Sequence, residues 1–190
     1  QRQMCIRDRH IGAHAFDVLV LGGHSIAQIC LYESRLKLLL TGDQLLERIT
    51  PNIGVWPYGE TDPLPRYLES LRTIAGLDIE LVLPAHHDVY HAGVKRAHGL
   101  VAHHQKALRK FMARLGAGGM NATELGYAVY GAQSDPLHAY LAMGETLAHL
   151  LWLERSGYAR RDETPAVTRW YPVTAADGEP TLTLSGDMSR

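Results

Sequence analysis

Three short apolar segments of this chain end in glycine or proline, and a side chain able to bind metal follows each of them. The side chains are His24 after "VLVLGG", Asp43 after "KLLLTG" and His86 after "LVLPA". Apolar runs bounded by Gly and Pro predict β-strands, and these residues let the chain turn sharply as it leaves a sheet. If the three strands end at one edge of a sheet, the three side chains meet there although they are far apart in sequence.

Two imidazoles and a carboxylate suit zinc, iron or manganese, and the two oxygens of a carboxylate can bridge a pair of ions. Asp43 is therefore predicted to be a bridging ligand. Taken singly, a histidine after a strand is usually a loop residue, and an aspartate after glycine is usually a turn residue or helix cap. The prediction depends on the joint pattern.

The spacing of apolar residues predicts alternating strands and helices. Strands are predicted over residues 16–23, 27–34, 36–42 and 79–84. Between the last two, Asp62 offers an N-cap and Pro63 a first helical position for an amphipathic helix that Gly76 ends. Strands that alternate with helices indicate an α/β arrangement.

A long helix is predicted over residues 94–116. Its apolar stripe contains Leu100, Val101, Leu108, Met112 and Leu115. Its charged residues are all basic: Lys95, Arg96, Lys106, Arg109, Lys110 and Arg114. This basic face is either a solvated surface or a site that attracts an anionic substrate tail or RNA. Three histidines of the helix are expected to be surface or packing residues rather than ligands: His98, His103 and His104.

After a glycine-rich break, Thr123 is expected to cap a short helix, and a longer helix is predicted over residues 136–156. The residues expected to face inward from the longer helix are Leu137, Tyr140, Leu141, Leu147, Leu150 and Leu151. Residues 158–163 and 168–173 could form a two-stranded wing. Helix, helix and hairpin is the order of a winged helix. Because Arg155 is the single Lys or Arg in the long helix, packing or a lid is expected rather than DNA reading.

Composition excludes several classes of protein. The chain has 190 residues, 46% of them apolar, and a formal net charge of −1, so nothing in its overall charge indicates nucleic acid or a membrane as a partner. No apolar run is long enough to span a bilayer, and no signal-peptide pattern is present. The two cysteines, Cys5 and Cys30, form no CxxC motif, which favours a reducing, cytoplasmic setting.

The motifs "GGHSIAQICLYES", "LLLTGDQLLERITPNIGVWP", "DPLPRYLESLRTI" and "LVLPAHH" resemble, in this order, those of the metallo-β-lactamase-fold hydrolases. The branch resembled is that of glyoxalase II and related thioesterase-like enzymes, from about residue 10 to about residue 160. The resemblance implies an α/β/β/α sandwich, often followed by a winged-helix domain. It also implies that His24, Asp43 and His86 are metal ligands.

The sequence departs from the family pattern at several positions. The family's HxHxDH motif, which supplies four further ligands, is absent, so the chain is expected to be an N-terminally truncated piece of a larger protein. Gln28 stands where the family often has a second histidine, which predicts changed surroundings rather than a lost metal. His87 stands where the family commonly has glycine, so His86, His87 and His91 compete as ligands, and motif position favours His86.

Four regions are expected. Residues 1–9 would be extraneous or disordered, 10–93 the C-terminal half of the hydrolase domain, 94–173 a linking helix and winged-helix-like domain, and 174–190 a tail. The implied activity is cleavage of a thioester or ester by a metal-bound hydroxide, with Asp43 as the catalytic residue. Two divalent ions are expected, with zinc preferred over iron or manganese, and the chain alone is expected to be inactive. The alternatives are an RNA phosphodiester nuclease and a non-catalytic winged-helix binding module.

Overall fold

The computed structural model describes residues 9–163 and 167–173. The chain divides into two compact units. Unit 1 consists of Gln1–Pro51 and Pro65–Val101, and unit 2 consists of Asn52–Leu64 and Ala102–Arg190. Strands and helices alternate as the sequence predicts, so the α/β class is confirmed. The expected tail, Cys5 and all of the expected extraneous N-terminus except Arg9 lie outside the described residues.

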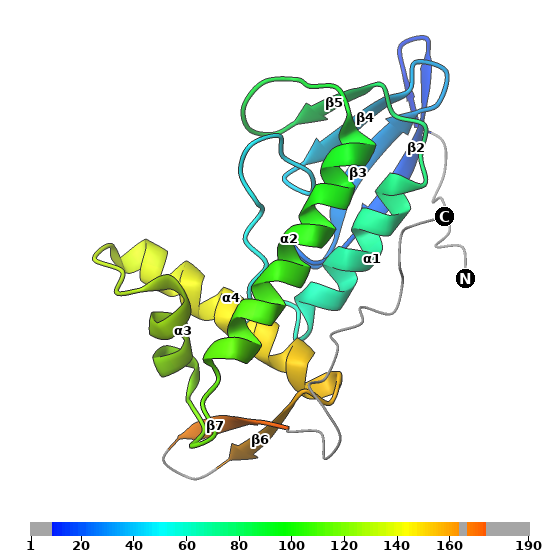
Figure 1. The fold of residues 1–190 in the computed structure, drawn as a ribbon. Helices are drawn as coiled ribbons and strands as arrows, with labels where there is room; N and C mark the ends of the chain where they lie inside the picture. Colours follow the sequence, from blue (N-terminus) through cyan, green and yellow to red (C-terminus); the bar gives the residue numbers. More distant parts are fainter. Residues whose placement is uncertain (1–8, 164–166, 174–190) are drawn as a thin grey trace. The chain divides into compact units, whose positions relative to one another are not determined.

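Unit 1 is built on a sheet whose described strands have the order β1-β2-β3-β4-β5 (Figure 1). The strands are β1 (Arg9–Ile11), β2 (His14–Leu21), β3 (Gln28–Glu33), β4 (Leu38–Gly42) and β5 (Leu81–Pro84). β1 to β4 pair in antiparallel fashion, and β5 pairs in parallel with β4. A parallel pair needs a crossover connection, which contains helix α1 (Pro63–Ala75).

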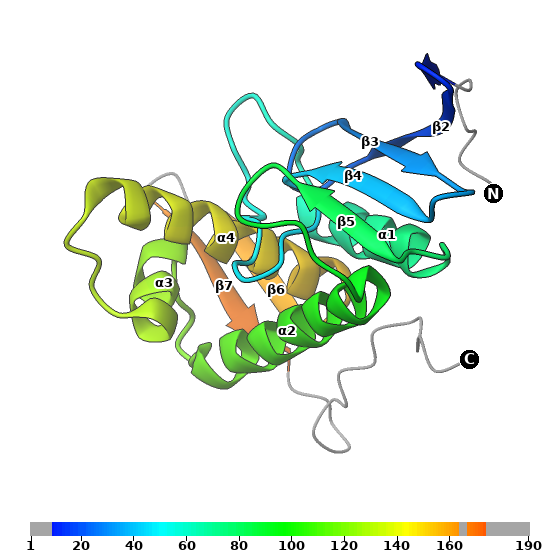
Figure 2. The same cartoon turned by 90° about the horizontal axis from the view of Figure 1, so that it is seen from above.

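One face of this sheet is covered by α1 and the first turns of α2 (Gly93–Arg114), as Figures 1 and 2 show. The strand residues buried there are Leu21, Cys30, Tyr32, Leu39 and Val82. Packing of α2 on the sheet is close, because a Cβ at Gly93 would lie 2.6 Å from Cγ2 of Val82.

The opposite face of the sheet is aliphatic and only partly covered. Beside the buried Phe16 and Glu33, alternation and strand register place eight aliphatic residues on it: Val18, Val20, Ile29, Leu31, Leu38, Leu40, Leu81 and Leu83. All eight are intermediate or exposed, and Ile29 is 58% exposed. A face of this composition is typical of a sheet that packs against a second layer.

Unit 2 contains the second half of α2, helices α3 (Ala122–Tyr130) and α4 (Pro136–Arg155), and a hairpin of β6 (Ala159–Glu163) and β7 (Thr168–Pro172). The expectation that Thr123 caps α3 is wrong. The cap is Asn121, whose side chain accepts a hydrogen bond from the Glu124 amide at 2.9 Å. The Glu124 carboxylate accepts one from the Asn121 amide at 3.0 Å, which completes a capping box.

The expectation that the first turns of α4 face inward is also wrong. Leu137 and Tyr140 are 61% and 54% exposed. Tyr140 stacks on Trp56, with ring centroids 4.6 Å apart, and the Trp56 ring lies against Gly144, where burial of the helix begins. The buried residues of α4 are Gly144, Thr146, Ala148, His149, Leu150, Trp152 and Leu153.

Asp62, expected to cap α1, forms an ion pair with Arg155 within unit 2. Within the described ranges, every helix is too short or too polar to cross a lipid bilayer.

Candidate metal centre

The three side chains predicted as ligands lie together in unit 1. His24 Nε2 is 3.9 Å from Asp43 Oδ2, and His86 Nε2 is 3.2 Å from Asp43 Oδ1. The carboxylate therefore has one imidazole beside each of its two oxygens. The side chains of His24 and Asp43 are 29% and 32% exposed and that of His86 is 63% exposed, so the cluster is open to solvent.

Glycine permits the sharp turns that lead into two of these residues. Gly23 has φ +109°, and a Cβ there would lie 2.3 Å from Cβ of Tyr67 in α1. Gly42 has φ +54°, and a Cβ there would lie 2.4 Å from Nε2 of Gln28. Because no other residue combines this backbone freedom with so little volume, the chain can leave the sheet at these two points.

The ends of β4 and β5 are joined directly. The amide of Ala85 donates to the carbonyl of Gly42 at 2.9 Å. Ala85 directly precedes His86, and Gly42 directly precedes Asp43. The bond therefore places the side chains of His86 and Asp43 next to each other.

A buried polar network joins the ends of β2 and β4. Gln44 is fully buried, and its Nε2 donates to the carbonyl of Gly22 at 3.0 Å. The amide of Gly22 donates to Ser70 Oγ at 3.0 Å, and the Tyr67 hydroxyl donates to the Gln44 carbonyl at 3.2 Å. These bonds hold the residues beside His24 and Asp43. Gln44 and Ser70 were not identified from the sequence. The one available signal was that Gln44, a polar residue, directly precedes two apolar residues.

The competing side chains have other positions. His87 has φ +67°, a left-handed conformation that suits glycine, and Nδ1 of His91 lies 2.7 Å from the carbonyl oxygen of Glu80. Burial raises the pKa of the Cys30 thiol to about 12, so it is not a thiolate at neutral pH. The histidine of this segment that contacts Asp43 is His86.

The types of these side chains suit a metal centre, but there are too few of them to complete one. Asp43 Oδ1 is buried and accepts no hydrogen bond of normal geometry from the part of the chain that is described, which suits an oxygen that binds a cation. However, the described residues contain no group of three or more His, Cys, Asp or Glu side chains that could hold one ion. Catalytic zinc typically has three protein ligands. The three side chains are therefore fewer than the protein ligands that a two-ion centre would need.

Residues 8–86, which include all three side chains, match the family model described as the metallo-beta-lactamase superfamily. Over these residues the chain is similar to the metallo-beta-lactamase superfamily. No curated protein matches the chain.

Two crystal structures of similar proteins extend the comparison. A metallo-beta-lactamase family protein from Thermus thermophilus is 30% identical, with a TM-score of 0.78 over 88% of this chain and 52% of that chain. A beta-lactamase domain protein from Burkholderia ambifaria is 29% identical, with a TM-score of 0.83 over 91% of this chain and 52% of that chain. The chain thus spans about half the length of each of these superfamily proteins.

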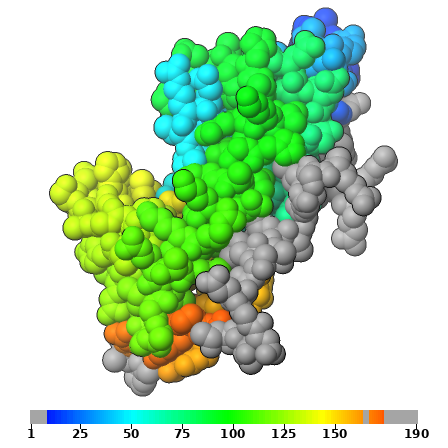
Figure 3. Space-filling model, in the orientation of Figure 1, coloured from blue at the N-terminus to red at the C-terminus, as the bar shows by residue number. Residues whose placement is uncertain are grey.

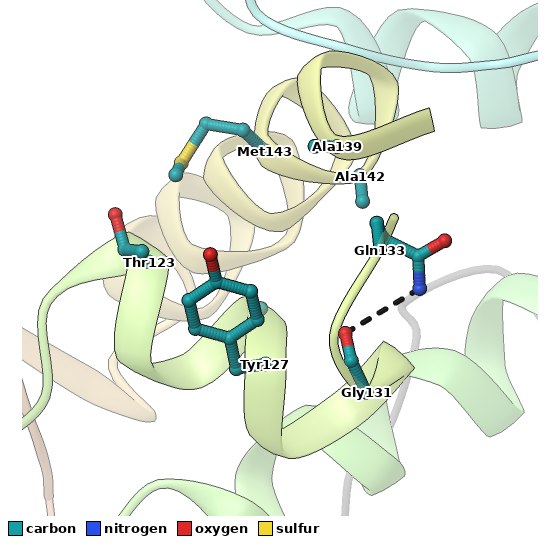
Figure 4. A pocket seen from close by; sticks show the side chains of 8 residues that line it. Thr123, Tyr127, Gly131, Gln133, Ala139, Ala142 and Met143 are labelled. Atoms are coloured by element: carbon teal, nitrogen blue, oxygen red, sulfur yellow. Dashed lines mark hydrogen bonds between the residues drawn. The ribbon is translucent and has the colours of Figure 1, made fainter. Parts of the chain in front are cut away.

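Unit 2 has a small hollow between α3 and α4, shown in Figure 4. Its volume is about 80 Å³, and Tyr127 and Met143 lie at its border. The described residues that line it include no carboxylate, imidazole or thiol. This hollow is too small for a drug-sized ligand and has no chemistry of the kind found beside Asp43.

Proposed function

We propose that this protein takes part in metal-dependent hydrolysis of a thioester or ester. The observation that supports the proposal most strongly is the Asp43 carboxylate between the rings of His24 and His86. The match of residues 8–86 to the metallo-beta-lactamase superfamily model supports metal-dependent hydrolysis in general. The glyoxalase II-like branch, and with it the thioester or ester, is proposed from the motifs around these residues.

The side chains have separate roles in this proposal. His24 and His86 would each help to hold a cation, and Asp43 would serve both. The negative charge of Asp43 would offset the repulsion between two cations, which a neutral amide in its place could not do. A pair of divalent ions, most suitably zinc, supplies Lewis acidity for a carbonyl oxygen and lowers the pKa of a water. The exposure of His86 leaves room for a substrate to approach.

The test uses the protein expressed from its own gene, assayed with a thioester, an ester and RNA. We expect hydrolysis of the thioester or ester that chelation removes and Zn²⁺ restores. Asp43→Asn should lose most of this activity, whereas Asp78→Asn, at an exposed ion pair with Lys37, should keep it. Cleavage of RNA instead would support the nuclease. No turnover of any substrate, with zinc present, would favour the binding module.

The nuclease is the second candidate because five basic residues of α2 are exposed: Lys95, Lys106, Arg109, Lys110 and Arg114. Figure 3 colours this part of the chain green. Two members of the predicted basic face have structural roles. Arg96 donates to the carbonyls of Leu46 and Ile49, and Lys110 donates to the carbonyl of Val129. The smaller number of available cations supports the small-molecule substrate over RNA.

We also infer that unit 2 is a winged-helix-like domain with a packing role. The order of α3, α4 and the β6–β7 hairpin supports this inference. Arg155, the single Lys or Arg of α4, pairs with Asp62, which argues against a DNA-reading helix. A cytoplasmic location stays a prediction from cysteine usage.

A further inference from the structure

Unit 2 also contains a larger cavity, which is lined by none of the candidate metal ligands. It has a volume of about 310 Å³ and lies between the second half of α2, the end of α3 and α4. Ala107, Phe111 and Val129 provide an apolar wall. A second cavity, of about 240 Å³, shares two lining residues with it, Tyr130 and Glu145. Because small-molecule sites begin at about 300 Å³, the larger cavity is large enough for a small organic ligand.

Packing of aromatic rings holds the apolar wall in place. Phe111 is fully buried, stacks on the His149 ring with centroids 4.7 Å apart, and lies edge-on to Tyr130 at 5.8 Å. Nδ1 of His149 is in turn 2.8 Å from the backbone carbonyl oxygen of Glu145. The wall is therefore formed by the protein itself, and a ligand would have little to reorganise.

Glu145 and two lysines give the cavity its polar groups. The Glu145 carboxyl forms a hydrogen bond with the Tyr130 hydroxyl, and burial raises the pKa of Glu145 to about 7. At neutral pH this carboxyl is therefore protonated in a large share of molecules and can donate a hydrogen bond. Lys106 and Lys110 line the same cavity, and the Lys110 ammonium lies 5.8 Å from the centre of the Tyr130 ring.

Four histidines of the described chain also lie in this part of unit 2. His103 and His104 are on α2, and His138 and His149 are on α4. Burial lowers the pKa of His104, and it lowers the pKa of His149 to about 4. These two rings are therefore neutral near pH 7 and do not stabilise an ionised carboxylate. His103 lines the larger cavity, and His138 lines the smaller one.

We propose that the larger cavity binds a small organic carboxylate with a short apolar chain. The chain would lie on Phe111 and Val129, and the carboxylate would accept a hydrogen bond from protonated Glu145 and face the Lys106 ammonium. Two lysines oppose a cationic ligand, and a hydrocarbon would offer no acceptor to the proton of Glu145. The inference involves residues of unit 2 alone, so it holds whether or not the proposed hydrolysis is correct.

Titration with hexanoate, followed by amide NMR spectra of the whole chain, tests the proposal. At pH 6 we expect saturable shifts around Phe111 and Glu145, and no such shifts with hexylamine. Binding of an anion favours protonated Glu145, so affinity should fall as the pH rises through the pKa of this group. Between pH 6 and pH 8 the expected decrease is about tenfold.

Three variants complete the test. Glu145→Gln keeps a hydrogen-bond donor but cannot ionise, so it should bind hexanoate with little dependence on pH. Lys106→Met should weaken binding, whereas Arg109→Met, at an exposed cation of α2 outside the cavity lining, should not. The proposal is overturned by the absence of saturable shifts at pH 6, by equal binding of hexylamine, or by equal hexanoate affinity at pH 6 and pH 8 in the unmodified protein.

Discussion

Replacing Gly23 by alanine tests whether close contact between the end of β2 and α1 positions the residue that precedes His24. At φ +109° an alanine would be strained, at a cost of about 1–2 kcal/mol. Its Cβ would also lie 2.3 Å from Cβ and 2.5 Å from Cα of Tyr67. Because the overlap involves the backbone of α1, no side-chain rotation relieves it, and overpacking of this kind costs about 1–3 kcal/mol. The expected loss of unfolding free energy is therefore about 2–5 kcal/mol.

Gly12→Ala is the matched control. Gly12 also has a positive φ, +60°, but among the residues that the structure describes no heavy atom lies within 4 Å of the position its Cβ would take. This variant carries only the backbone cost, about 1 kcal/mol. The difference between the two variants thus measures the contact with Tyr67.

Urea unfolding followed by circular dichroism compares both variants with the unmodified protein, and the midpoints convert to free energies where the slopes agree. We expect Gly23→Ala to unfold at a clearly lower urea concentration than Gly12→Ala. The contact argument is refuted if the two variants lose the same stability, since the backbone cost would then be the whole effect.

Three further predictions concern buried or capping groups. Gln44→Leu removes one of two side-chain donors to the buried Gly22 carbonyl, the other being the Ser70 hydroxyl, so it should cost about 0.5–1.5 kcal/mol of unfolding free energy in urea. Asn121→Ala should cost about 1 kcal/mol by the same measurement, and Thr123→Ala clearly less, because Asn121 is the cap. Burial raises the pKa of Glu145, so between pH 4.5 and about 7 the folded protein binds more protons than the unfolded chain. The contribution of this group to the free energy of unfolding should therefore decrease as the pH rises through that range. Glu145→Gln should remove that decrease, which is measured as the difference in unfolding free energy between the variant and the unmodified protein at each pH. Curves of unfolding free energy against pH with the same shape for both proteins would contradict the prediction.

Strands and candidate ligands of unit 1 could be predicted because local sequence determines both. Each apolar run ends in Gly or Pro, and each ligand comes directly after it, so neither inference needs a long-range contact. Gln44 could not be found in this way. Its role depends on a bond to Gly22, a residue 22 positions earlier, and nothing near Gln44 in the sequence indicates that partner.

The errors in unit 2 have two physical causes. Asn121 and Thr123 are both good capping residues, and the choice between them depends on which one has Glu124 three residues later. The errors at Leu137 and Tyr140 arise because helical periodicity identifies a face of a helix but not how far along its length that face is covered. In α4 burial starts near Gly144, against which the ring of Trp56 lies.

Strand direction explains why these three segments, and not others, carry the candidate ligands. β2 and β4 are both antiparallel to β3, and β5 is parallel to β4, so β2, β4 and β5 run the same way and end at one edge. β3 runs the opposite way and begins at that edge, where Gln28 pairs with Leu21. It therefore contributes its first residue to the site, and the Gln28 side chain lies against Gly42, directly before Asp43. Gln28, one of the positions at which the sequence departs from the family pattern, thus lies where β3 reaches the candidate metal centre, beside the residue that bends the chain into Asp43.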